Sequence, residues 1–302
     1  MHKPTFRRSR RAALAGILAV SAVVLATTGS AVPVLTATRA AQKPFWSDEF
    51  AGAAGTRPSA AAWRTEVGNR AQEGWWNNEL QYYTADAANS SLDGSGKLLI
   101  QARKAPAAAK LPCWPRGNCA YTSARITTEG TVSLKYGRAD VSARLPTGAG
   151  LLPAIWMLGN NDRIWPAQGE IDIAEVVGDS PRAVHGTAHG PTYYDENGIG
   201  GAKRLSAPAS KGFHLYSVVK KRYSITWLVD GKPYFTLTPK DLPADRDWVF
   251  EQDMHLLLNV AVGGDWPGTP AASTVFPATM SVDYVRLYGE GVVDGEVVFS
   301  PR

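Results

Sequence analysis

Three carboxylates interrupt an apolar run at residues 169–178, which read GEIDIAEVVG. Glu170 and Asp172 are two residues apart, whereas Glu175 follows after a longer gap. On an α-helix Glu170 and Glu175 would point about 140° apart, with Asp172 about 200° from Glu170, so no single site would receive all three. On a regular strand Glu175 would face away from the other two, because side chains alternate. One extra residue, a β-bulge near Ala174, returns Glu175 to their face, so the spacing predicts a bulged strand.

Three acids on one face are equipped for acid–base chemistry. Like charges this close are costly, so one carboxyl group should have its pKa raised until it holds a proton near neutral pH. An ionised carboxylate beside a protonated carboxylic acid is the equipment that cleaves glycosidic bonds. The Cα atoms of Glu170 and Glu175 would lie roughly 13 Å apart, and a concave sheet would let the carboxyl groups approach to about 5–5.5 Å, the spacing of retaining enzymes. An amphipathic strand with a solvated face would show the same bare pattern.

Tryptophans accompany the acids. Trp156 and Trp165 lie in the segment that leads into the acidic run, and Trp75-Trp76 stand beside Asn77, Asn78 and Glu79. Indole faces stack on sugar rings, while amides and carboxylates bond hydroxyl groups. These neighbours favour a sugar-binding site, although a tryptophan buried in the core is the alternative for each of them.

The segments that must position these residues are short and rich in β-branched and aromatic residues. Many alternate between apolar and polar residues and are bounded by Gly, Pro, Asn and Asp, whereas sustained helical periodicity is nearly absent. This composition predicts an all-β sandwich or barrel. The expected strands are residues 97–103, 131–145, 153–158, 224–231, 255–262 and 280–289.

The N-terminal residues have the layout of a secretory signal peptide. Four arginines precede an uncharged stretch from Ala12 to Ala26, which is short for a membrane span of roughly 20 residues. We expect a leader at residues 1–40, exported by the general or the twin-arginine route. Cleavage near Ala31, Ala37 or Ala40 fits equally well.

Removal of the leader changes the charge balance. Six of the 32 basic residues and no acidic residue lie in the leader, which leaves 26 basic against 27 acidic residues, a net charge of −1. Nothing then argues for a nucleic-acid or anionic-membrane partner. The remaining chain fits one domain, expected at residues 41–289 with a tail at 290–302.

Two cysteines, Cys113 and Cys119, bracket CWPRGNC. In an exported protein they predict a disulfide that closes a surface loop. A zinc pair is the alternative, but five residues intervene and no histidine is near.

At these residues the chain resembles glycoside hydrolase family 16, in the Glu-x-Asp-x-x-Glu form typical of bacterial endo-β-1,3-glucanases (laminarinases). The resemblance spans nearly the whole mature chain, in the order WSDEF, WWNNELQYYT, YGRADVSARLP, PAIWMLG, HGTAHGP, WLVDG, LLLNVAVGGDWPG and MSVDYVRLYG. It implies a curved antiparallel β-sandwich, a concanavalin A-like jelly roll with the cleft on its concave face. It also implies Glu170 as nucleophile, Glu175 as acid/base and Asp172 between them.

The resemblance implies further site residues. Trp156 and Trp165 would line the donor side of the cleft, and other substrate-binding groups would lie nearby. An aspartate occupies a position that in relatives often helps to hold a structural calcium ion. No cofactor would be required for the chemistry. The remaining residues carried over in this way are Asn78, Arg125 and His189 for the substrate and Asp283 for calcium.

The sequence also departs from the family pattern. Leu152 stands where an aromatic residue is often found before Pro-Ala, and Val218-Val219-Lys220 replaces a common Val-Glu-Trp. Both changes put the details of substrate binding in doubt. His185 and His189 share a strand face and form a candidate metal pair, but we favour contact with substrate or with the acid/base residue because no third ligand motif is present.

Together these features predict a secreted, retaining endo-β-1,3-glucanase that acts on laminarin-like β-glucan as a monomer. One alternative is a non-catalytic β-glucan-binding domain on the same fold. Another is the same chemistry on mixed-linkage glucan or on a galactan.

Overall fold

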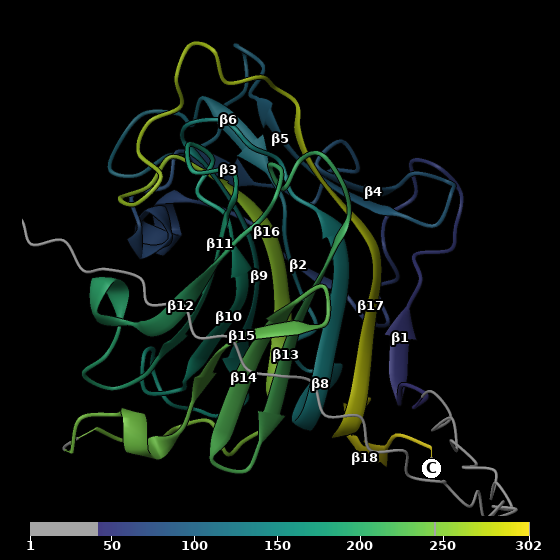
Figure 1. Ribbon diagram of the computed structural model, residues 1–302. Coiled ribbons are helices and arrows are strands. Elements are labelled where there is room, and N and C mark those ends of the chain that lie inside the picture. The colour runs from purple at the N-terminus through teal and green to yellow at the C-terminus, as the bar shows by residue number, and fades with distance from the viewer. Residues whose placement is uncertain (1–41, 245, 302) are drawn as a thin grey trace, which may run out of the picture. The chain divides into compact units, whose positions relative to one another are not determined.

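The computed structural model describes residues 42–244 and 246–301 (Figure 1). The expected leader and its cleavage sites lie outside these residues. Strands dominate the described chain, and its helices are three short 3₁₀ turns: η1 (Arg70–Trp76), η2 (Asp195–Asn197) and η3 (Pro239–Asp241). No helix among the described residues has the length and apolar character needed to cross a membrane.

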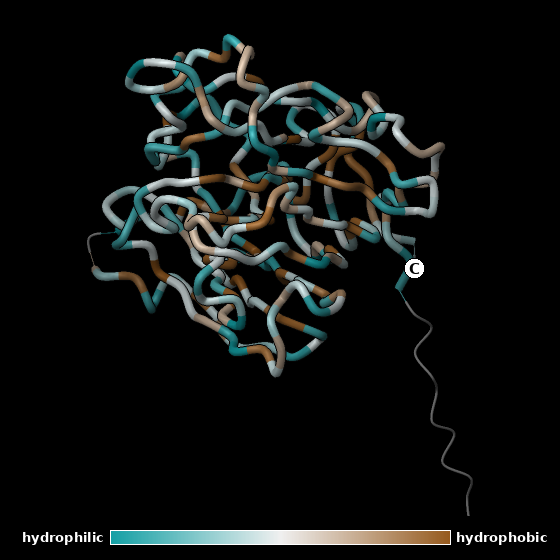
Figure 2. Tube along the Cα trace, turned by 90° about the horizontal axis from the view of Figure 1, so that it is seen from above, coloured by the Kyte–Doolittle hydropathy of each residue, from teal (hydrophilic) through white to brown (hydrophobic). Residues whose placement is uncertain are grey.

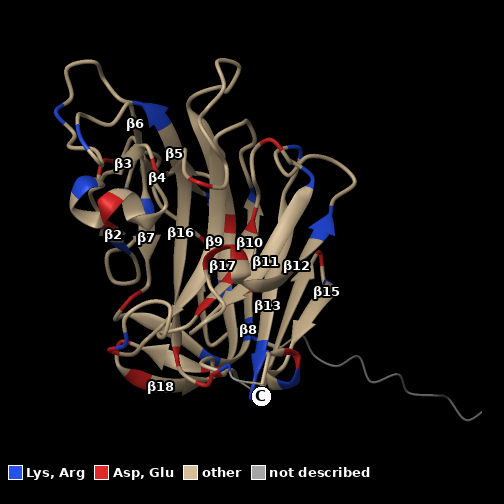
Figure 3. Ribbon diagram, turned by 90° about the vertical axis from the view of Figure 1, so that its left-hand side faces the viewer, with Lys and Arg blue, Asp and Glu red and all other residues tan. Residues whose placement is uncertain are grey.

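A first sheet of seven strands carries the acidic segment (Figure 3). Its neighbours pair antiparallel, and the acidic residues of β10 lie near the middle. In spatial order the strands are β2 (Arg64–Glu66), β7 (Arg125–Thr127), β16 (Met254–Val262), β9 (Leu151–Gly159), β10 (Glu170–Glu175), β11 (Ala183–His189) and β12 (Ile199–Arg204).

A second antiparallel ladder packs against the first. Its long members are β8 (Val132–Arg144) and β17 (Ala278–Val293), which pair along most of their length. The other strands of this ladder are β13 (His214–Lys221), β14 (Ser224–Val229), β15 (Lys232–Leu237), β5 (Leu98–Lys104), β4 (Ser90–Leu92), β1 (Trp46–Asp48) and β18 (Glu296–Phe299). A short pairing of β16 with β8 joins the two ladders into one curved sheet.

The core lies between the two ladders. Ile171 and Ile173 of β10, Val141 of β8 and Val285 of β17 belong to one buried apolar cluster, whose apolar segments meet in the interior in Figure 2. In β11 every second residue is buried, as expected for a strand with one face on the core. The central strand β16 is buried along its whole length, which explains its nearly unbroken apolar sequence HLLLNVAV.

The fold predicted from the sequence is confirmed, with two corrections. The expected strand at 280–289 continues to Val293, and β18 pairs back onto it, so residues 290–299 form a hairpin and not a tail. One pair, β3 (Gln81–Tyr83) with β6 (Tyr121–Ser123), is parallel. Val218 and Lys220 lie buried in β13 of the second ladder, so neither side chain of this departure is exposed on the face that carries the acids.

The predicted disulfide is present between Cys113 and Cys119. It closes a short loop whose Trp114 backbone N–H donates to the buried side chain of Asn69, 2.7 Å away. Asn69 also donates to the carbonyl oxygens of Glu79 and Gln81. The loop therefore braces the segment around η1, which reaches the first sheet where Leu80 N–H bonds the Val262 carbonyl oxygen.

Candidate active site

The acidic strand β10 contains the bulge that its spacing predicts. Asp172 pairs with Thr187 and Glu175 with His185 of β11, so two residues of β10 stand opposite the single residue Gly186. The register against β9 shifts at the same place, between Asp172 and Ala174. The intervening residues Ile173 and Ala174 are both buried. The bulge therefore returns Glu175 to the face that carries Glu170 and Asp172.

A buried tryptophan supports the bulge from the core side. The Trp227 indole N–H donates to the backbone carbonyl oxygen of Asp172 at 2.7 Å. A Cβ atom on Gly186 would lie 2.4 Å from the Trp227 ring, so only glycine leaves room for the indole opposite the bulge. An unpaired carbonyl group at the bulge thus finds its donor in β14, more than fifty residues away.

Each of the first two acids has its own hydrogen-bond partner on the outer face. The Trp165 indole N–H donates to the Glu170 carboxylate. His189 Nε2 and Asp172 Oδ2 are 2.9 Å apart, and Asp172 is almost fully buried. Among the described residues no hydrogen-bond partner is found for His189 Nδ1, so the imidazole ring is oriented chiefly by Asp172.

The electrostatics of the site favour protonated glutamates. Burial, followed by the negative charge of Asp172, raises the pKa of Glu170 to about 8. The same two causes raise the pKa of Glu175 well above its ordinary value. The charge of His189 and the Trp165 hydrogen bond both lower the pKa of Glu170, whereas Glu175 has no such hydrogen bond. Glu170 is therefore the better placed of the two to ionise, and Glu175 to keep its proton.

The histidines of β11 differ in charge. Burial alone would lower the pKa of His189, but the hydrogen bond to Asp172 and the charges of Asp172 and Glu170 raise it to about 9. Burial lowers the pKa of His185, which therefore stays neutral near pH 7. Each contacts a different group, Asp172 for His189 and the Trp266 ring for His185. These separate contacts do not fit a metal pair, the less favoured reading of HGTAH.

Aromatic side chains lie on the outer face of the sheet beside the acids. Trp156 pairs in register with Asp172, and its indole N–H donates to Asn259 Oδ1 at 2.7 Å. The Arg125 guanidinium lies between two indoles, 4.5 Å from the centre of the Trp75 ring and 4.6 Å from that of Trp156. Its edge bonds the Glu66 carboxylate. Arg125 thus contacts both indoles and helps to hold them in place, and its contact with substrate stays a prediction.

Other predicted residues lie at the two ends of the acidic row. Trp165 packs edge to face against Tyr194, whose ring is 5.5 Å away, beside Glu170. Asn78 donates to the Asp265 carboxylate at 2.9 Å, which ties the segment after η1 to the loop after β16. The sequence did not single out Tyr194, Asn259 or Trp266, because single aromatic and amide residues in loops and strands carry no spacing signal.

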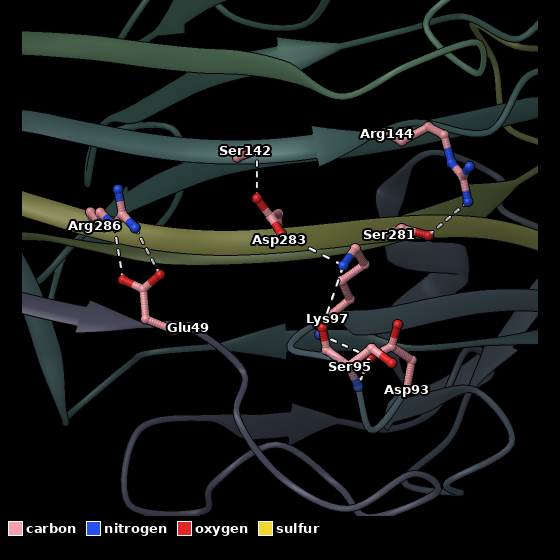
Figure 4. Close-up of polar contacts among 9 residues, drawn as sticks. All are labelled: Glu49, Asp93, Ser95, Lys97, Ser142, Arg144, Ser281, Asp283 and Arg286. Carbon is pink, nitrogen blue, oxygen red and sulfur yellow. Dashed lines mark hydrogen bonds and ion pairs between the residues drawn. The ribbon is translucent and has the colours of Figure 1, made fainter.

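Asp283 lies on β17, in the second ladder (Figure 4). Its carboxylate contacts the Lys97 ammonium group at 3.8 Å and the Ser142 hydroxyl group at 3.5 Å. Calcium requires six to eight oxygen ligands, and an ammonium group beside the carboxylate does not fit that donor set. The structural calcium ion stays a prediction.

Glu170, Asp172 and His189 are the described residues that meet the spacing of a metal site, with ligand atoms within 4.8 Å of one another. The hydrogen bond between His189 and Asp172 already uses two of these groups. Paired in this way, they act on the pKa of Glu170 in opposite directions, and proton chemistry is the activity that the arrangement supports.

Comparisons with known proteins agree with this geometry. The model of the glycosyl hydrolases family 16 matches residues 75–286. A beta-glucanase from Rhodothermus marinus is 40% identical over 253 residues, which cover 80% of this chain and 84% of the relative. The structure of an endo-beta-1,3-glucanase from Pyrococcus furiosus superposes with a TM-score of 0.75 at 40% identity, covering 81% of this chain and 93% of that one. The laminarinase catalytic domain of Thermotoga maritima MSB8 gives 0.74 at 41%, covering 81% and 97%. The chain belongs to family 16 of the glycosyl hydrolases.

Proposed function

We propose that this chain hydrolyses internal bonds of β-1,3-linked glucan with retention of anomeric configuration. The observation that carries the proposal is the bulged strand β10, which presents Glu170, Asp172 and Glu175 on one face. The names of the relatives, beta-glucanase and endo-beta-1,3-glucanase, support the substrate class. The chemistry belongs to the acids, and the β-1,3 linkage is inferred from similarity.

In the first step Glu170 attacks the anomeric carbon while Glu175 donates its proton to the departing glycosidic oxygen. Glu170 must be ionised for this attack, and the Trp165 N–H and the charge of His189 favour that form. Glu175 must be protonated, and burial together with the charge of Asp172 keeps it so. The two demands are met by neighbouring acids with different surroundings.

In the second step a water molecule attacks the same carbon and releases Glu170 as a carboxylate. Glu175, now ionised, accepts the proton of that water and returns to its starting state. Asp172 and His189 touch neither bond. They set the charge around the glutamates and hold the row in register.

Replacement of Glu170 by Gln tests the nucleophile. Glu170→Gln should lower kcat on laminarin by at least about 10⁴-fold, because one essential group of a unit is lost, while the melting temperature changes little. Reducing-end release and a thermal melt measure both. A folded variant with substantial activity would remove Glu170 from the nucleophile role.

The anomeric configuration of the first product tests retention. An NMR spectrum taken early in hydrolysis should show the β-anomer from a β-glucan. An initial α-anomer would contradict the double displacement and the assignment of Glu170.

A non-catalytic β-glucan-binding domain is the second candidate from a different class. The presence of both glutamates argues against it, because binding alone needs no acid/base pair. Tight binding of laminarin without new reducing ends would favour it.

The preferred polymer is a further proposal. A panel of laminarin, lichenan, agarose and carrageenan, with sizing of the products, separates β-1,3-glucan from mixed-linkage glucan and galactans. We expect laminarin to be cleaved fastest, with oligosaccharides of several sizes appearing early, as internal cleavage requires.

Export and oligomeric state are proposed from the sequence. We expect the protein outside the cell as a monomer, with its N-terminus after Ala31, Ala37 or Ala40. N-terminal sequencing of the secreted protein and size-exclusion chromatography with light scattering measure these properties.

A further inference from the structure

The loop after β16 forms a wall at the Glu175 end of the acidic row. This loop, residues 263–268, is fastened to the segment after η1, since Asp265 N–H bonds the Asn77 carbonyl oxygen at 3.0 Å and Asn78 bonds the Asp265 carboxylate. Its own turn is closed by a bond from Gly268 N–H to the Gly264 carbonyl oxygen, also 3.0 Å. The wall is therefore held by its bonds to the segment after η1 and by its own turn.

One side chain of this wall reaches the acidic row. The Trp266 ring lies 5.1 Å from the His185 ring, with the planes 79° apart. His185 is the register partner of Glu175 on β11, so the two side chains share the outer face. Trp266 thus lies beside the neighbour of Glu175, although Trp266 and Glu175 are 91 positions apart in the sequence.

Trp266 also keeps half of its surface exposed, 50%, despite this anchoring. Leaving that much indole in water sacrifices hydrophobic stabilisation. A fixed, half-exposed indole is a suitable surface for the apolar face of a sugar ring, because little side-chain freedom remains to be lost on binding. The neutral His185 beside it adds no charge that would lower the pKa of Glu175.

The position of this indole along the row determines which sugar it would meet. In the proposed reaction Glu170 attacks the donor sugar, whereas Glu175 protonates the oxygen that leaves with the acceptor-side sugar. Trp165 contacts Glu170, and Trp266 lies by way of His185 next to Glu175. The two indoles therefore stand at opposite ends of the bond to be cleaved.

We propose that Trp266 binds the sugar on the acceptor side and so sets the ratio of sugar transfer to hydrolysis. The inference rests on the proposed function. When a sugar occupies this place, its hydroxyl oxygen attacks the anomeric carbon of the glycosyl-enzyme. The bond from that carbon to Glu170 breaks, a new glycosidic bond forms, and Glu175 accepts the hydroxyl proton. Water in the same place gives hydrolysis.

The test measures formation of the glycosyl-enzyme separately from transfer of its sugar to an acceptor. β-Laminaribiosyl fluoride is the donor, because fluoride leaves without touching Trp266, and laminaribiose is the added acceptor. For Trp266→Ala, kcat/KM for fluoride release should stay within about twofold of the wild-type value. The ratio of tetrasaccharide to hydrolysed product should fall about tenfold, because one aromatic contact with the acceptor sugar is lost. Trp266→Phe should restore much of the ratio.

Phe299→Ala is the matched control, because Phe299 is an exposed aromatic on β18 in the other ladder. It should change neither quantity. An unchanged transfer ratio in Trp266→Ala, or an equal fall of fluoride release and transfer, would overturn the inference alone. A wild-type protein that cleaves neither the fluoride nor laminarin would overturn the proposed function and the inference with it.

Discussion

At the scale of single residues, the active site works through unequal surroundings of similar groups. The charge of His189 acts on both glutamates, but Glu170 also accepts an indole N–H, whereas Glu175 faces the neutral His185. Asp172 lies between them, almost fully buried and bonded to His189. The residue types alone would not distinguish nucleophile from acid; the neighbours do.

Asp172 should control the pH profile of the reaction. Its negative charge raises the pKa of Glu170 and of Glu175, and this effect exceeds the opposing effect of His189. In Asp172→Asn both pKa values should fall, so both limbs of the bell-shaped profile of kcat/KM should move to lower pH. The loss of charge on His189, whose pKa Asp172 raises, offsets part of the shift.

A pH series of initial rates on laminarin measures this shift, with the melting temperature as the control for folding. Limbs that stay in place or move to higher pH would show that the charge of Asp172 does not govern the glutamates. The two limbs report the coupled pair rather than either residue alone.

At the scale of elements, the bulge in β10 reconciles an uneven spacing with a single active face. Two residues of β10 occupy the space opposite Gly186, and the Trp227 indole bonds the carbonyl group of Asp172 there. Without the bulge, Glu175 would turn into the core among Ile171 and Ile173, where an unpaired carboxyl group is costly.

The role of the bulge in placing Glu175 can be tested by changing the number of residues between Asp172 and Glu175. Deletion of Ala174 leaves the sequence EIDIE, in which regular alternation keeps all three acids on one face. We expect this variant to keep measurable hydrolysis. Insertion of a second Ala after Ala174 gives EIDIAAE, in which the same alternation keeps the last acid on the outer face but carries it two residues farther from Glu170 than in EIDIE, so hydrolysis should be lost. Reducing-end assays on folded protein, verified by circular dichroism, compare the two variants. Equal loss of activity in both would contradict the role of the bulge.

At the scale of the whole molecule, a buried lysine links β13 to β8 and to the segment that precedes β16. Lys220 of β13 is fully buried, and its ammonium group donates to the backbone carbonyl oxygens of Lys135 and Gln252. Burial lowers the pKa of Lys220 to about 8. A neutral amine still has two N–H groups for these two acceptors, so both hydrogen bonds remain after deprotonation. Deprotonation also removes the free-energy cost of burying a charge.

The free energy of unfolding should therefore depend on pH through the titration of Lys220. Because its folded-state pKa is lower than its unfolded-state value, the unfolded state binds more protons between about pH 8 and 10.5, and stability rises with pH in that window. The free energy of unfolding of the wild type relative to Lys220→Met should grow across it by up to about 3 kcal/mol. Urea unfolding of both proteins at pH 7 and 10 measures the difference; a constant difference would contradict the buried charge.

Much of this protein was determined by the sequence alone. The alternation of apolar residues predicted an all-β sandwich and most of its long strands, because a strand with one buried face repeats every two residues. The uneven spacing of Glu170, Asp172 and Glu175 predicted the bulge by the same rule. The two cysteines predicted the disulfide that is present.

Only the tertiary structure decided which distant residues surround these acids. Trp227 under Asp172, Trp266 beside His185, Arg125 between two indoles and the burial of Lys220 all join residues of different strands or loops. Such contacts depend on strand order and register across the sheet, and a local two-residue period carries no information about which strands become neighbours. The sequence could therefore place the acids on one face, while the fold alone gave each its partner and so its charge.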